Sequence, residues 1–174
     1  MPELTLSSLS ELTALGSVRN PQQITNANAR PRRHAPAITD VMTVTSDQKV
    51  KAHMEGLFHR FGWSVALVSS GAAAVDFANN NLAAVALCSE DLPDGTWKDV
   101  ARAFHAPPHS PVLIVIGEDK SILSQVTQMG GFDVLTQPFN QVDVLWAITS
   151  AWHTWMTAYE KLYELPSRLE EVAS

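Results

Sequence analysis

Acidic and hydroxyl side chains follow an apolar run near the middle of the chain. The run 85–88 has the length and composition of a strand buried on both faces, and Ser89 follows it directly. In open α/β sheets, functional groups lie just past the carboxyl ends of strands. Carboxylates there could hold a metal ion or accept a phosphoryl group, whereas a serine hydroxyl would need a base. The acidic and turn-forming residues after Ser89 are Glu90, Asp91, Pro93, Asp94 and Gly95.

These acidic residues allow two interpretations. We favour a solvated loop after a strand, which needs no functional site to explain it. Alternatively, Asp91 accepts a phosphoryl group, or Asp47 holds a metal ion together with Glu90. The six histidines have no HxxH or HExxH spacing, and the chain has no glycine-rich phosphate loop and no G-x-S-x-G motif. We therefore expect no catalytic residue, no metal ion and no cofactor, and we rank an enzyme last among the possible functions.

Strand-like and helical segments alternate along the chain and would position these groups. Apolar segments of strand length lie at 41–44, 65–68, 85–88, 112–116 and 133–135. Helices are predicted from an Asp47 cap to Phe61, over 72–79, 97–104 and 121–129, and from Asn140 onward. Five strands that alternate with five helices imply a parallel sheet with helices on both faces.

The composition favours a soluble protein with a substantial core. The chain has 174 residues, of which 45% are hydrophobic, and a formal net charge of -6, which argues against non-specific nucleic-acid binding. No apolar stretch is long enough to span a bilayer, and the N-terminus lacks the pattern of a signal peptide. We expect no membrane association and a cytoplasmic location. Cys88, the single cysteine, is expected to be a small core residue.

Three regions are predicted. Residues 1–37 form a flexible leader in which Leu9, Leu12 and Leu15 share one helical face, followed by a polar, proline-marked stretch. A basic cluster at 30–34 in this leader is interpreted as a solvated tether. Residues 38–152 form the folded domain, and residues 153–174 form a helical extension and a tail.

Several segments together resemble the receiver domains of response regulators, the phosphoacceptor modules of two-component signalling. The resemblance covers about residues 40–152. It implies a flavodoxin-like (βα)5 three-layer sandwich with sheet order 2-1-3-4-5. The segments that carry it are GWSV (62–65), SGAAAV (70–75), LPDG (92–95), PVLI (111–114) and GFDVLTQPF (131–139).

The resemblance also implies that the phosphorylation site has been lost. Receivers use two acidic residues after the first strand, an aspartate at the end of the third, a hydroxyl at the end of the fourth and a lysine before a proline. The switch aromatic of the family falls on Val134. The other matching positions are Thr45 and Ser46, with Asp47 just beyond, then Ser89, Ile116 and Gln137.

The physical consequences of these replacements reinforce one another. Neutral hydroxyls are far weaker Mg²⁺ ligands than carboxylates. Gln137 cannot neutralise the charge that develops on a phosphoryl group, and Ile116 cannot donate a hydrogen bond to it. The resemblance thus implies an atypical, stand-alone receiver that is not an enzyme and acts by contact with other signalling proteins, independently of phosphorylation. The docking face would be the side of the domain that runs from its fourth strand to its last helix.

Two other functions remain open. An orthodox phosphorelay receiver could use a displaced acid, Asp91 or Asp47. A small-molecule-sensing pseudo-receiver could bind a ligand in a cavity among Thr45, Ser89, Ile116 and Gln137.

The final helix carries an apolar seam that continues past the usual end of a receiver near Trp152. We expect Pro166 to end it. The extension either folds back over its own domain or pairs with another chain, for example as a homodimer, and the aromatic content favours the second. The seam consists of Leu145, Ile148, Trp152, Trp155, Tyr159 and Leu162.

Overall fold

The computed structural model describes residues 37–172, with side chains up to Leu162. The predicted leader, apart from Ala37, and the last two residues of the tail lie outside the described residues. Within 37–172, no helix combines the length and the hydrophobicity that a bilayer crossing requires.

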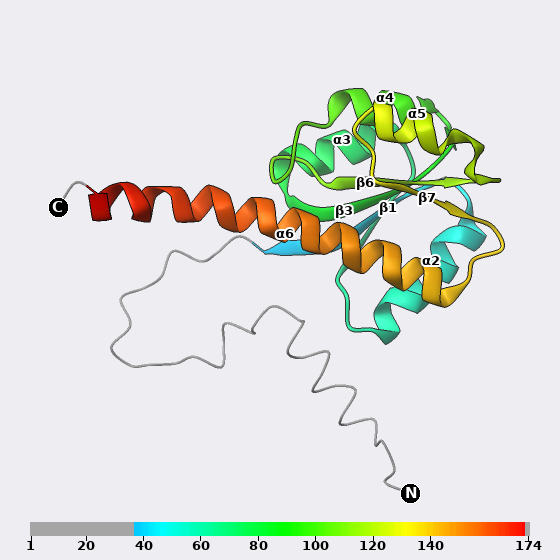
Figure 1. Ribbon diagram of the computed structural model, residues 1–174. Helices are drawn as coiled ribbons and strands as arrows, with labels where there is room; N and C mark the ends of the chain where they lie inside the picture. The colour runs from blue at the N-terminus through cyan, green and yellow to red at the C-terminus, as the bar shows by residue number, and fades with distance from the viewer. Residues whose placement is uncertain (1–36, 173–174) are drawn as a thin grey trace, which may run out of the picture.

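Five parallel strands form one sheet, as the sequence predicted (Figure 1). Their order, β2-β1-β3-β6-β7, is the predicted order 2-1-3-4-5 when only the strands of this sheet are counted. The central strands are almost entirely buried because helices cover both faces of the sheet. The strands are β1 (Ile38–Val44), β2 (Val65–Val68), β3 (Leu82–Ser89), β6 (Val112–Gly117) and β7 (Asp133–Thr136).

Helices lie in two layers on the two faces of the sheet, which confirms the three-layer fold class. In Figure 1, α2 (Gln48–Arg60) and α6 (Gln141–Val172) lie below the sheet. Above it lie α3 (Gly71–Asn80), α4 (Trp97–Ala103) and α5 (Leu123–Gln128), the last preceded by a 3₁₀ turn at Lys120–Ile122. Each layer buries its own apolar cluster, one around α2 and α6 and one around α3, α4 and α5.

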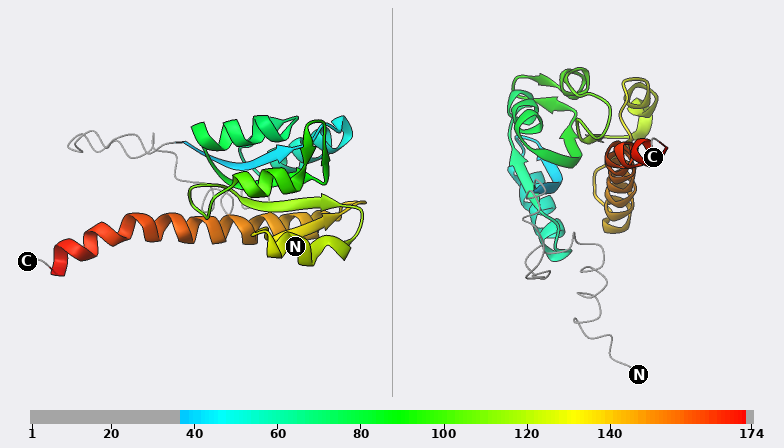
Figure 2. Two further views of the ribbon diagram at one scale, coloured as in Figure 1. Left: turned by 90° about the horizontal axis from the view of Figure 1, so that it is seen from above. Right: turned by 90° about the vertical axis from the view of Figure 1, so that its left-hand side faces the viewer.

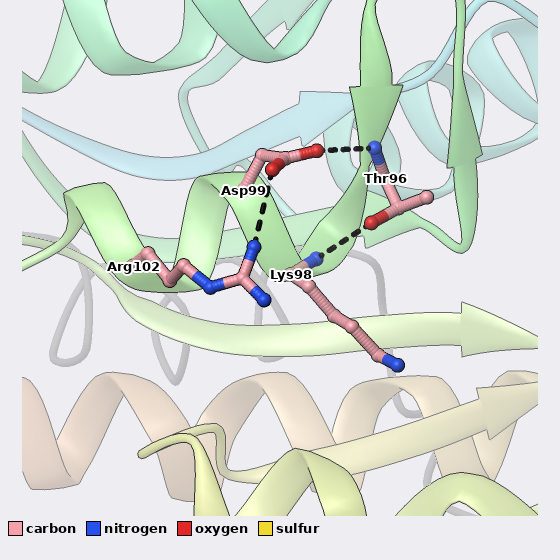
Figure 3. Close-up of polar contacts among 4 residues, drawn as sticks. All are labelled: Thr96, Lys98, Asp99 and Arg102. Carbon is pink, nitrogen blue, oxygen red and sulfur yellow. Dashed lines mark hydrogen bonds and ion pairs between the residues drawn. The ribbon is translucent and has the colours of Figure 1, made fainter.

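Side-chain caps explain where three of these helices begin. The Asp47 carboxylate accepts hydrogen bonds from two backbone N–H groups at the start of α2, as predicted. Ser70 caps α3 in the same way. At α4, Thr96 and Asp99 form a capping box, in which the Thr96 N–H donates to Asp99 Oδ2 at 2.9 Å. Figure 3 shows this box together with the ion pair from Arg102 to Asp99.

Two features differ from the sequence-based expectation. A short hairpin, β4 (Asp91–Leu92) and β5 (Gly95–Thr96), surrounds the turn that was predicted at Pro93 and Gly95. Strands of two residues carry too little alternation to be detected from sequence. In addition, α6 continues to Val172 (Figure 2), so the prediction that it ends at Pro166 was wrong. A proline removes one backbone donor and strains the preceding turn, but it can bend a helix without ending it.

Candidate functional site

A hydrogen-bonded pair of hydroxyls lies where β1 and β3 reach the same edge of the sheet. Thr45 directly follows β1 and Ser89 ends β3, and the two strands are neighbours in register. The Ser89 hydroxyl donates to Thr45 Oγ1 over 2.7 Å. Thr45 Oγ1 also accepts a hydrogen bond from the Asp47 N–H at 3.2 Å, and the Thr45 side chain is buried. The pair is therefore neutral, and both lone pairs of Thr45 Oγ1 accept hydrogen bonds from within the protein.

The neighbouring positions supply no charge to this pair. Ile116 lies beside Ser89 in the β3–β6 register and is buried. Gln137 follows β7 and is exposed, and Ser46 is exposed after β1. The structure thus brings Thr45, Ser89 and Ile116 together, as the parallel topology predicted.

The nearby carboxylates are engaged at helix starts or dispersed. Asp47 caps α2, and its Oδ1 lies 2.8 Å from the Lys49 N–H. Asp94 accepts hydrogen bonds from the N–H groups of Gly71 and Ala72, each at 2.9 Å. These bonds stabilise the charged form and hold the pKa of the Asp94 carboxyl below its usual range. Among the residues described, no three His, Cys, Asp or Glu side chains are grouped so that they could hold a metal ion.

The Glu90 carboxylate lies at the end of β6. An added Cβ on Gly117 would lie 3.3 Å from Glu90 Oε2, which places this carboxylate against the strand end. Asp91 is exposed on β4. Asp47, Glu90 and Asp91, the acids of the alternative site, therefore lie at three different places: the start of α2, the end of β6 and the exposed side of β4.

Several open surface cavities lie elsewhere in the described part of the chain. None of them is lined by Thr45, Ser89, Ile116 or Gln137. These cavities therefore give no support to the alternative in which a ligand binds among Thr45, Ser89, Ile116 and Gln137.

Most of the predicted seam on α6 packs against its own domain, which corrects its interpretation as a partner surface. Ile148 and Trp155 are fully buried in the cluster beneath the sheet, and Tyr159 stacks on Trp155 with ring centroids 5.1 Å apart. Trp152 is half-buried, and its indole Nε1 donates to Asp40 Oδ1 at 3.1 Å. The buried members of the seam lie in one cluster with Val41, Val85 and Ile114 of the sheet. Leu145 is half-buried, and Leu162 is exposed.

An apolar surface lies on another face of α6, within the face from the fourth strand to the last helix that the resemblance implied for docking; the sequence analysis did not single out its residues. Val142 and Trp146 have exposed fractions of 72% and 77%, and they are four residues apart on one helix face. Beside them is a cavity of about 220 Å³ lined by Phe139, Lys120 and Trp146 among others. We call Val142, Trp146 and Phe139 the Trp146 surface. The sequence did contain a signal for this surface, because Val142 and Trp146 are apolar, lie four residues apart and are not members of the seam.

Charged side chains flank the Trp146 surface. Lys120 Nζ lies 3.5 Å from Asp133 Oδ1, and both residues line the cavity. Asp143 lines it as well and is exposed. An apolar centre with charged neighbours is the usual composition of a protein contact.

Comparison with known proteins gives one kind of match. No protein-family model and no curated protein sequence matches the chain. Solved structures of receiver domains do match. The signal receiver domain of an HD domain-containing protein from Pseudomonas fluorescens has a TM-score of 0.64 and 14% identity, covering 76% of this chain and 98% of that one.

Two further solved structures have TM-scores of 0.59 and 19% identity. One is the receiver domain of a sensor histidine kinase from Pseudomonas aeruginosa with a magnesium ion in its active site cleft, covering 68% of this chain and 99% of that one. The other is the receiver domain of the Saccharomyces cerevisiae response regulator Ssk1, in complex with the phosphotransfer protein Ypd1, covering 71% and 92%. At these identities the matches establish the fold.

Proposed function

We propose that this chain, which has the fold of response-regulator receiver domains, is an atypical receiver of two-component signalling that works by protein contact without phosphoryl transfer. The observation that carries the proposal is the hydrogen bond of 2.7 Å between the hydroxyls of Ser89 and Thr45. A receiver that transfers phosphoryl groups needs carboxylates at these places, both to hold Mg²⁺ and to act as the nucleophile.

The electrostatics of the site support the same conclusion. No cationic side chain follows β7 at the position of Gln137, so nothing there would neutralise a transferring phosphoryl group. Asp47 and Asp94, which could replace the lost acids in principle, bind backbone N–H groups of α2 and α3. Recruiting either of them would uncap a helix.

The Trp146 surface is the proposed contact site. An exposed fraction of 77% for a tryptophan is unusual, because indole buries a large apolar area when it is covered. Tryptophan is also among the residues that most often dominate binding energy. The Ypd1 complex of the Ssk1 receiver is an example of this fold bound to another signalling protein.

The absence of phosphoryl transfer is testable with a small-molecule donor. When the protein is incubated with acetyl phosphate and Mg²⁺, we expect no phosphoryl-sized mass gain in intact-protein mass spectrometry, because no carboxylate stands at Ser89. A receiver with a full acidic site, treated in parallel, controls for the donor. A Mg²⁺-dependent gain would contradict the proposal, and Asp91→Asn and Asp47→Asn variants would then identify the acceptor.

The contact site is testable by a charge placed on the Trp146 surface. We expect Trp146→Glu to reduce partner capture from the cells that produce the protein by about tenfold or more, as is typical for loss of a central tryptophan. Thr154→Glu adds the same charge two turns further along α6 at an exposed position and should leave capture unchanged. Equal capture by both variants would place the contact elsewhere.

A further inference from the structure

A groove of about 490 Å³ lies at the place where the described chain begins. One wall comes from α6, through Tyr159 and Leu162, and another from the loop at Pro108 and His109. Ala37, the first described residue, is itself part of the lining. The rim is polar, with the asparagines 79–81.

The groove exposes apolar surface that the folded domain leaves uncovered. Leu162 has an exposed fraction of 43%, although it continues the seam whose earlier members Ile148 and Trp155 are buried. It is one of four large apolar side chains that are exposed in the described part of the chain. Tyr159 packs on Trp155 from the groove side. The apolar wall of the groove therefore continues the buried cluster beneath the sheet out to the surface of the domain.

The sequence holds an apolar segment that precedes Ala37 and could match this groove. Thirty-six residues precede Ala37, and Leu9, Leu12 and Leu15 repeat there at a spacing that places them on one helical face. We propose that the leucine segment, residues 4–15, binds the groove of its own chain and covers Leu162 and Tyr159.

Tethering favours this occupant over a second molecule. Residues 16–36 connect the leucine segment to the groove wall at Ala37, and a connection of that length spans at most about 70 Å, so it reaches every part of the groove. A segment tethered in this way has an effective concentration in the millimolar range. A second copy at micromolar concentration is about a thousandfold more dilute, so the tethered segment fills the groove even when its intrinsic affinity is low.

Methyl NMR on the full chain tests the proposal. With leucine methyl groups labelled, we expect cross-peaks between the methyls of Leu162 and those of the leucine segment, and no change in the Leu162 shifts over a tenfold dilution. Leu9→Asp with Leu12→Asp should weaken these cross-peaks by about tenfold or more and move the Leu162 shifts. A Leu162→Val variant assigns the resonance.

A matched variant separates a specific contact from an effect of charge. Ser7→Asp with Ser10→Asp adds the same charge on the other side of the leucine segment and should leave the Leu162 shifts unchanged. Unchanged near-ultraviolet circular dichroism shows that each variant is folded. The proposal is overturned if Leu9→Asp with Leu12→Asp leaves Leu162 unaffected. It is also overturned if the Leu162 shifts follow the dilution, because a second copy then occupies the groove.

Discussion

Trp155→Ala is expected to lower the free energy of unfolding by about 3–5 kcal/mol, the usual loss when a buried tryptophan is truncated. The side chain of Trp155 has no exposed surface and lies in the cluster that joins α6 to the sheet. Its removal would leave a cavity beneath the sheet and end the stacking with Tyr159. Urea denaturation followed by far-ultraviolet circular dichroism measures the loss.

Trp146 supplies the matched control on the same helix. Its side chain is 77% exposed, so Trp146→Ala should change the free energy of unfolding by no more than about 0.5 kcal/mol. Among the described residues, Trp155 Nε1 is a buried donor without a partner, so Trp155→Phe removes no hydrogen bond and should cost much less than the alanine variant. Equal losses for Trp155→Ala and Trp146→Ala would show that α6 packs through a different face.

Introducing two carboxylates at the hydroxyl pair is expected to destabilise the fold unless Mg²⁺ is present. Thr45→Asp with Ser89→Asp places two negative charges where hydroxyl oxygens now lie 2.7 Å apart, in surroundings that are largely buried. Repulsion at such distances amounts to about 2–4 kcal/mol at pH 7. Because Gln137 is neutral, no lysine offsets it. Thermal denaturation with and without Mg²⁺ measures the effect.

The pH dependence of this double variant has a definite sign. Repulsion and burial raise the pKa of at least one introduced carboxyl in the folded state above its unfolded value of about 3.9. The loss in the free energy of unfolding is therefore absent below about pH 4, where the introduced carboxyls are protonated in both the folded and the unfolded state. It grows as the pH rises toward the raised pKa. Thr45→Asn with Ser89→Asn is the uncharged control. If both double variants respond equally to pH and to Mg²⁺, charge repulsion is not the cause.

The sequence predicted the sheet because its central strands, at 85–88 and 112–116, are continuous apolar runs, the pattern of strands buried on both faces. It also predicted that Thr45 and Ser89 would meet, because the carboxyl ends of neighbouring parallel strands share one edge. The hydrogen bond between them needed coordinates, since a hydroxyl pair has no spacing signature.

The two tryptophans of α6 show what the sequence could not decide. Trp155 and Trp146 are the same residue type on one helix, yet one is buried and the other exposed. A seam spaced by three and four residues indicates an apolar face, but it does not say whether that face meets the protein's own sheet or another chain. The structure decides it, because Trp155 is buried in the cluster between α6 and the sheet.

Cys88 has a practical consequence for site-specific labelling. It is the only cysteine in the sequence and is buried in β3, where burial, with a smaller contribution from the Asp94 charge, raises the pKa of its thiol to about 12. At neutral pH almost none of it is thiolate, the form that reacts with maleimides and iodoacetamides. Cysteines introduced at exposed positions can therefore carry fluorophores or spin labels on the otherwise native chain. With one such cysteine at position 161 in place of Lys161 and a second in the leader, the distance between them becomes measurable without replacing Cys88.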